Sequence, residues 1–199
     1  FEWGLHAAVS QRGGFALMLH AAVVGRGGRA LVLPAASGSG KSTLCALLVA
    51  AGWQFISDEF LVLTGTPPDL VISSLPQPIA LKGQSVGLVE PLFPPESWGA
   101  TWPHASKGII RYLRPPMAPE DVALEPGWIL LPRFRAGAAT KFSPVLRRDA
   151  FLQVGPNAFT YHIRGQDGFR AAAELVRQSQ CAALEFGDGH EAVRAIDEW

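Results

Sequence analysis

The 199-residue sequence is poor in cysteine, in charged residues and in long hydrophobic runs. Its two cysteines, Cys45 and Cys181, both lie in apolar segments, which favours buried thiols in a reducing cytosol over a disulfide framework. No apolar stretch approaches the roughly 20 residues that a membrane-spanning helix needs, and nothing resembles a signal peptide. The sequence therefore predicts a cytoplasmic protein without a membrane segment.

A charge excess of either sign is also missing. Lys plus Arg and Asp plus Glu each total 17, so the net charge is +0 and no global basic field would recruit nucleic acid. Hydrophobic residues make up 48% of the chain, which is enough for one buried core. We expect a single catalytic domain over residues 1–199. Because the chain begins at Phe1 without a methionine, a short upstream segment is expected to be missing.

The order of apolar segments predicts a mixed α/β fold with helices flanking a mixed sheet. Two apolar segments, Phe15–Val24 and Arg29–Pro34, flank a glycine-rich turn and predict a β-hairpin. The helical spacing of Ser42–Ala51 predicts a helix that ends at Gly52. Leu92–His104 lacks a period and predicts a loop. Later strands are expected at Gly108–Leu113, Trp128–Phe134 and Ala182–Phe186, and later helices at Arg148–Val154, Gly168–Gln178 and His190–Trp199.

A glycine-rich stretch between the hairpin and the first helix matches a phosphate-binding loop. It fits the pattern G-x-x-x-x-G-K-[ST] at every fixed position except the first, where Ala35 replaces glycine. Small residues let backbone N–H groups turn toward a phosphate, Lys41 reaches the β- and γ-oxygens, and Ser42 offers a hydroxyl to Mg²⁺. The alternative is an ordinary glycine-rich turn, which does not require Lys followed by Ser. The residues expected to bind ATP are Ala36, Ser37, Gly38, Ser39, Gly40, Lys41, Ser42 and Thr43.

An acidic pair, Asp58 and Glu59, interrupts the apolar segment Phe55–Leu63 that follows this helix. In a parallel sheet this position lies beside the phosphate site. Adjacent residues of a strand point to opposite faces, so the two carboxylates should have different roles. We expect Asp58 to accept the proton of the acceptor hydroxyl and Glu59 to reach toward Mg²⁺. The alternative is a pair of surface charges at a strand end.

These features together resemble the HPr kinase/phosphorylase family, most closely its short HPr-kinase-related (type A) branch. The resemblance rests on four pieces of sequence: His20-Ala21-Ala22-Val23, Pro34–Thr43, Ser57-Asp58-Glu59 and Lys107-Gly108-Ile109-Ile110. Without the resemblance, His20 alone would more often be a core histidine than a catalytic one.

The resemblance implies a P-loop kinase related to phosphoenolpyruvate carboxykinase, which uses ATP and Mg²⁺ to phosphorylate a serine of a protein or peptide. It places Asp58 as the base, Glu59 near the metal, His20 beside the reacting phosphate and Lys107 in a signature loop. Relatives of the short type are associated with exopolysaccharide clusters and with the tailoring of ribosomal peptides. The resemblance also leaves a homo-oligomer open.

Two departures from the family pattern argue against HPr itself as the acceptor. Thr43 stands where the HPr enzymes usually carry an acidic residue, and the signature loop is reduced to little more than Lys107-Gly108. The alternatives are a small-molecule P-loop kinase and a non-catalytic nucleotide switch. The second lacks support, since no LSGGQ signature or water-positioning Gln is evident.

The second half of the chain carries arginines that can reach an anionic group. Arg111 and Arg114 follow the signature-like Lys107, and a guanidinium stabilises a migrating phosphoryl group. We therefore expect Lys107, Arg111 and Arg114 to contact the phosphate or the acceptor.

Overall fold

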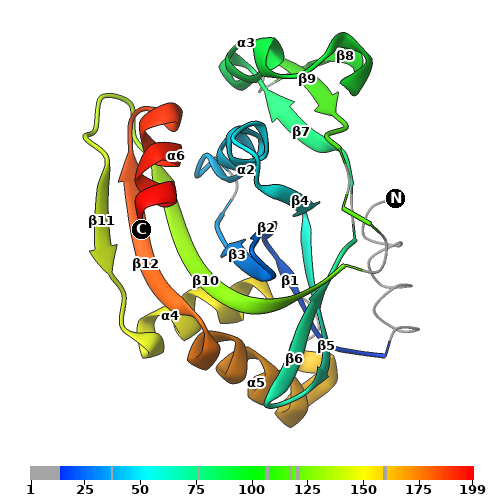
Figure 1. Ribbon diagram of the computed structural model, residues 1–199, viewed down its shortest axis with the longest axis vertical. Coiled ribbons are helices and arrows are strands. Elements are labelled where there is room, and N and C mark those ends of the chain that lie inside the picture. The colour runs from blue at the N-terminus through cyan, green and yellow to red at the C-terminus, as the bar shows by residue number, and fades with distance from the viewer. Residues whose placement is uncertain are drawn as a thin grey trace.

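The structure, a computed structural model, describes residues 14–36, 38–75, 77–105, 108–116, 118–119, 122–158 and 161–199. Within these residues the chain forms a nine-stranded mixed sheet, a three-stranded sheet and five α-helices (Figure 1). The mixed α/β class expected from the sequence is therefore confirmed.

The large sheet is strongly curved, and its longest strand, β10, follows the curve (Figure 1). Its N-terminal half pairs with β6 and β3, and its C-terminal half pairs with β12, which in turn pairs with β11. In spatial order the strands are β1 (Phe15–His20), β5 (Phe60–Thr66), β6 (Asp69–Ser73), β10 (Ala123–Phe134), β3 (Arg29–Leu33), β2 (Ala22–Arg26) and β4 (Gln54–Ser57), with β12 (Gln180–Phe186) and β11 (Lys141–Pro144) beside β10.

The small sheet and the helices lie on both sides of this curved sheet (Figure 1). The small sheet has the order β7 (Ile79–Lys82), β9 (Gly108–Leu113) and β8 (Trp98–His104). The helices are α2 (Lys41–Ala50), α3 (Gln84–Val89), α4 (Arg147–Val154), α5 (Tyr161–Gln178) and α6 (Gly189–Glu198). Single 3₁₀ turns occupy Glu90–Leu92, Pro95–Ser97 and Gly155–Asn157.

The expected β-hairpin is present as β2 and β3. Its turn consists of Gly27 and Gly28, both with positive φ, which suits a tight two-residue turn. The first expected strand, however, is not continuous: Ala21 separates β1 from β2. β1 pairs with β5, whereas β2 pairs with β3 and β4, so the chain changes partners at Ala21.

The apolar segment Phe55–Leu63 is broken in the same way. Asp58 and Glu59 lie between β4 and β5 rather than in the middle of one strand, which corrects the sequence expectation. The two breaks are adjacent, because the Ala21 N–H donates to the Glu59 carbonyl at 3.2 Å. His20 and the acidic pair therefore meet where two strand pairs of the curved sheet separate.

The loop predicted to bind phosphate, which we call the phosphate loop, begins at the same edge of the sheet. β2 is antiparallel to both β3 and β4, so these two strands run in the same direction with β2 between them. Their carboxyl ends therefore lie at one edge, and the chain continues there into the phosphate loop and into Asp58. The phosphate loop and Asp58 are therefore close, as expected, but β3 and β4 are not paired directly, because β2 lies between them.

Two cores cover the two faces of the sheet, and alternation along the strands assigns residues to them. In β3, Leu31 and Leu33 pack in the core with α2 and α6, while Ala30 and Val32 pack in the core with α4 and α5. Burial on both faces explains why β2 and β3 are apolar at nearly every position.

The structure corrects several element boundaries. Most of the expected loop Leu92–His104 forms 3₁₀ turns and β8, which the small sheet stabilises through pairing with β9. β10 begins at Ala123, five residues before the expected strand. α5 begins before Gly168 and is interrupted at Gly165, where φ is 51°. α3 and β11 were not expected at all.

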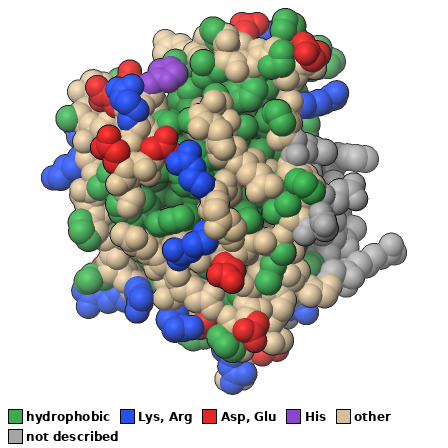
Figure 2. Space-filling view, viewed as in Figure 1, with side chains coloured by type: hydrophobic (Ala, Val, Ile, Leu, Met, Phe, Trp, Pro, Cys, Tyr) green, Lys and Arg blue, Asp and Glu red, His purple; other side chains and the backbone are tan. Residues whose placement is uncertain are grey.

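The surface mixes charges of both signs. On the face in Figure 2, Lys and Arg side chains are interspersed with Asp and Glu, and apolar side chains show between them. Among the described residues, no helix is both long enough and apolar enough to cross a membrane.

The packing of α2 makes a stability prediction. Leu48 is 0% exposed in the core between α2, α6 and the sheet, whereas Leu152 on α4 is 66% exposed. Leu48→Ala should lower the free energy of unfolding by about 2–5 kcal/mol, because it leaves a cavity in a packed core. The control Leu152→Ala should change it by less than about 0.5 kcal/mol. Urea denaturation of both variants measures this, and equal effects would contradict the core assignment.

Candidate functional site

The phosphate loop connects β3 to α2 and turns at two glycines. Gly38 and Gly40 have φ of 89° and 88°, a conformation that side chains rarely adopt. Among the described residues, every one with a positive φ is a glycine, so Ala35 keeps a negative φ. This is the condition under which alanine can replace the first glycine of the motif.

Gly40 is also required by close packing. A Cβ on Gly40 would lie 3.0 Å from Phe134 Cβ and 3.1 Å from a ring carbon of Phe186. The Phe134 N–H donates to the Ser39 carbonyl at 2.9 Å, which ties the loop to the end of β10. The ends of β10 and β12 therefore hold the loop in place.

The helix α2 presents its N-terminus to this loop. Its first intrahelical bond runs from the Leu44 N–H to the Gly40 carbonyl at 2.9 Å, so the preceding N–H groups have no helical partner. Gly40 offers no side-chain cap, and the first turn contains no acidic residue. These donors and the helix dipole favour an anion at this position.

Lys41 begins α2 and is buried, with an exposed fraction of only 6%. Its Nζ lies 2.9 Å from His20 Nε2 and donates to the Asp58 carbonyl at 3.2 Å. Burial lowers the pKa of Lys41, and the nearby carboxylates of Asp58 and Glu59 oppose that effect. The two carboxylates therefore favour the charged ammonium form of this buried amine.

His20 connects Lys41 to Glu59. His20 Nδ1 lies 3.2 Å from Glu59 Oε1, and the Glu59 side chain is 44% exposed. The hydrogen bond from His20 is the main reason that the pKa of Glu59 is lowered. Glu59 is therefore an ionised carboxylate that orients the imidazole.

Asp58 lies deeper than its neighbour and is 4% exposed. Burial raises the pKa of Asp58 to about 6, while Lys41 and a hydrogen bond from the Ser42 hydroxyl act in the opposite direction. One oxygen, Oδ1, is buried and has no hydrogen-bond partner among the described residues. The carboxylate thus faces the serine that was expected to bind Mg²⁺.

These groups surround a cavity of about 780 Å³, which we name the P-loop cavity. The α2 side, the small sheet and the ends of β10 and β12 all contribute to its wall. The predicted site residues that line it are His20, Ala36, Gly38, Gly40, Lys41, Ser42, Thr43 and Glu59. Ser39 and Asp58 adjoin this wall without lining it. Ser39 Oγ is buried and has no hydrogen-bond partner within the part of the chain that the structure describes.

The predicted arginines lie elsewhere. Arg111 contacts Glu90, donates to the Gly99 carbonyl at 3.1 Å and lies over the Trp98 ring. Arg111 and Arg114 do not line the P-loop cavity, and the Arg114 backbone N–H donates to the Ser97 carbonyl. Ser37 and Lys107 are outside the described residues.

Several cavity residues were missed by sequence reasoning because the small sheet brings them in. Lys82 at the end of β7 supplies a second cation, and Ser85 of α3 accepts a hydrogen bond from the Thr43 hydroxyl at 2.7 Å. Phe134 and Phe186 add an apolar wall with ring centroids 5.7 Å apart. In the local sequence, only Gly83 indicated a turn before α3. A turn residue does not reveal that α3 contacts α2.

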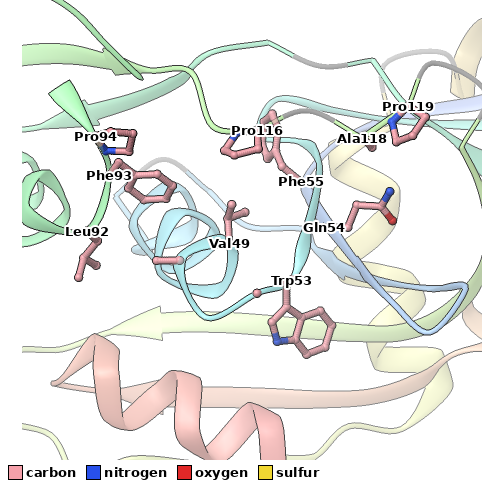
Figure 3. Close-up of a pocket in the computed structure, with 12 residues that line it drawn as sticks. Val49, Trp53, Gln54, Phe55, Leu92, Phe93, Pro94, Pro116, Ala118 and Pro119 are labelled. Carbon is pink, nitrogen blue, oxygen red and sulfur yellow. The ribbon is translucent and has the colours of Figure 1, made fainter. Parts of the chain in front are cut away.

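A second cavity, of about 440 Å³, lies at the other end of α2 (Figure 3). Apolar side chains converge on it from α2, β4 and the segments around Phe93 and Pro116. Its described lining contains no charged, nucleophilic or metal-ligating side chain. Of these two cavities, only the P-loop cavity is lined by charged and hydroxyl side chains among the described residues.

The raised pKa of Asp58 predicts a pH-dependent stability. The folded chain holds this proton more tightly than the unfolded chain, so the resulting stability is present below about pH 4 and is lost as the pH rises through about 6. Asp58→Asn cannot ionise and should lack this loss. Between pH 4 and 7, the unchanged protein should lose up to about 3 kcal/mol of unfolding free energy relative to the variant. Urea denaturation without Mg²⁺ measures this difference, and a constant difference would contradict the shift.

Comparison with solved structures gives a weak likeness. No family model matches the chain, and no curated protein matches it in sequence. Among solved structures, the chain is similar to the Hpr(Ser) kinase/phosphatase from Coxiella burnetii, with 12% sequence identity and a TM-score of 0.36. The match covers 91% of each chain. At this TM-score the interpretation of the site rests on the residues of this chain alone.

Proposed function

We propose that this protein binds ATP with Mg²⁺ and transfers the γ-phosphoryl group to a serine hydroxyl of a protein or peptide. The observation that carries the proposal is the convergence on one cavity of a phosphate loop, a buried lysine and the pair His20–Glu59. A polyphosphate site alone would serve any nucleotide-binding protein. The adjoining acidic residues Asp58 and Glu59, together with His20, favour transfer.

The nucleotide's phosphates fit against the start of α2. The N–H groups without helical partners there and the ammonium of Lys41 supply donors for the β- and γ-oxygens. Ring faces at Phe134 and Phe186 and the apolar Leu88 form the other wall, where a base can pack. A volume of about 780 Å³ suits a single nucleotide.

The donors near the loop fit Mg²⁺. The Ser42 hydroxyl and the Asp58 carboxylate are hard oxygen ligands, and no described residue forms a hydrogen bond with Asp58 Oδ1. In the described part of the chain, no group of three or more His, Cys, Asp or Glu side chains can hold a metal. This suits Mg²⁺, which takes few protein ligands and several from phosphates and water, and which when bound would neutralise charge on the phosphates.

The serine acceptor follows from the resemblance to the HPr kinase family carried by His20, the phosphate loop and Asp58-Glu59. One nucleotide would occupy much of the P-loop cavity, so an acceptor hydroxyl would approach from the surface, as a polypeptide side chain can. The role of the protein in catalysis is then mainly positioning and electrostatic stabilisation.

A labelling experiment tests the transfer. The protein is incubated with Mg²⁺, γ-labelled ATP and a lysate of its host, with Lys41→Ala as the inactive control. Label in a polypeptide that depends on Lys41 supports the proposal. Label confined to small solutes would contradict the polypeptide acceptor and favour a small-molecule kinase. Nucleotide binding without any transfer would contradict the enzymatic function and favour a switch.

The role of Lys41 in binding can be measured separately. Lys41→Ala removes a charged donor from the phosphate site, so it should weaken Mg·ATP binding by roughly 10- to 100-fold. Lys141→Ala is a matched control, because Lys141 is exposed on β11 and does not line the P-loop cavity. Isothermal titration calorimetry compares the two, and equal affinities would place the phosphates elsewhere.

A further inference from the structure

The small sheet has two edge strands, β7 and β8, because β9 lies between them. Within the described residues, neither edge strand pairs with any strand other than β9. An edge strand leaves a row of backbone N–H and C=O groups without ladder partners, and such a row can pair with a strand of another chain. The two edges of this sheet differ in whether they can do so.

The ladder between β7 and β9 determines which backbone groups of β7 point outward. The Gly83 N–H donates to the Ile109 carbonyl at 2.9 Å, and these two residues continue the register of the ladder. In an antiparallel ladder, residues that bond to the partner strand alternate with residues that do not. Leu81 therefore bonds to β9, while the N–H and C=O groups of Ala80 and Lys82 point toward the open edge.

A proline closes the edge of β8. By the same alternation, Ile110 is a residue of β9 that bonds to β8, and it faces Trp102. The next residue, Pro103, therefore occupies a position that points away from β9. Its ring lies on the open edge, where it offers no N–H. β8 is thus blocked as an edge strand, whereas β7 contains no proline.

The open edge of β7 borders the P-loop cavity. Side chains of a strand alternate between its two faces, yet the consecutive residues Ala80, Leu81 and Lys82 all line this cavity. That is the pattern of a strand whose edge, rather than one face, points into the cavity. Figure 1 shows β7 as the strand of the small sheet nearest to α2, and Leu81 packs in the core with that helix.

This edge lies beside the position expected for the γ-phosphate. Lys82 is close enough for its charge to act on the Lys41 ammonium and on the Glu59 carboxylate, which also line the cavity. A nucleotide with its phosphates at the start of α2 and its base at Phe134 and Phe186 leaves this side of the cavity for an acceptor. The outward backbone groups of β7 therefore face the side from which a hydroxyl would approach.

We propose that the acceptor polypeptide binds in an extended conformation as an additional strand along the open edge of β7, with its serine at the phosphate loop. This inference rests on the proposed phosphoryl transfer and specifies how the acceptor is recognised. Ala80 and Lys82 each donate one N–H and offer one C=O to the added strand.

Pairing along β7 restricts the class of acceptor. Backbone hydrogen bonds do not depend on side-chain identity, so the main requirement is an extended segment that carries a serine. A serine presented on a helix does not meet this requirement, because the backbone N–H groups of a helix are already bonded within it. Opposite Lys82, an acidic side chain on the added strand is favoured.

The first test uses the unchanged protein with Mg²⁺, γ-labelled ATP and a library of short peptides that have a central serine. The most strongly labelled peptide is then remade with one backbone amide N-methylated at a time. Because ladder bonds alternate along a strand, kcat/KM should fall by roughly tenfold or more at every second residue of the paired segment. At the residues between, it should fall by less than about threefold.

The second test places a proline on each edge of the small sheet. Ala80→Pro removes an outward N–H from β7 without removing a bond to β9. The kcat/KM for the selected peptide should fall by roughly tenfold or more, while affinity for Mg²⁺ and a non-hydrolysable ATP analogue stays within about threefold. Thr101→Pro is the matched control, because the Thr101 N–H also points away from β9 but lies off the P-loop cavity. It should leave both quantities unchanged.

The outcomes separate this inference from the proposed function. Equal effects of N-methylation at neighbouring residues, or normal peptide labelling by Ala80→Pro, would overturn binding along β7 and leave the kinase function intact. Nucleotide binding without label on any peptide would overturn the polypeptide acceptor and this inference with it. The N-methylated series uses the unchanged protein, so it decides between these outcomes even if Ala80→Pro does not fold.

Discussion

The buried ammonium of Lys41 is the constraint on which the site depends. A charge that is 6% exposed is costly unless it has partners, and here the partners are His20 Nε2 and the Asp58 carbonyl, with two carboxylates nearby. They come from the end of β1 and from the β4–β5 break. The contacts that stabilise the Lys41 ammonium therefore join the phosphate loop, His20 and the acidic pair in one place.

The curved sheet makes this meeting possible. Where the strand pairs β1–β5 and β2–β4 separate, the chain leaves regular pairing at Ala21 and at Asp58–Glu59. The Ala21 N–H and the Glu59 carbonyl still pair across the gap, which keeps the two breaks in register. In an uninterrupted strand, the side chains of Asp58 and Glu59 would point to opposite faces of the sheet. The break instead leaves Asp58 beside Ser42 and Glu59 beside His20.

The parts that depend on local sequence could be predicted. The hairpin with its glycine turn, the loop before α2, the helix α2 itself and β9 follow from glycine positions and from apolar periodicity over short distances. The two strand breaks could not be predicted, because Ala21 is apolar and the partner exchange is tertiary. β8 carries Pro and Gly and reads as a loop, yet pairing with β9 makes it a strand. Arg111 looked available for phosphate, but Glu90, Gly99 and Trp98 engage it, and only the folded small sheet reveals those contacts.

The central claim is that the P-loop cavity holds a nucleotide's phosphates at the start of α2, with Lys41 as a donor to them. A crystal structure of the protein with Mg²⁺ and a non-hydrolysable ATP analogue tests it most directly. We expect the β- and γ-phosphates against the N–H groups at the start of α2, with Lys41 Nζ hydrogen-bonded to their oxygens. An analogue bound away from this loop, or phosphates at the loop without a hydrogen bond from Lys41, would contradict it.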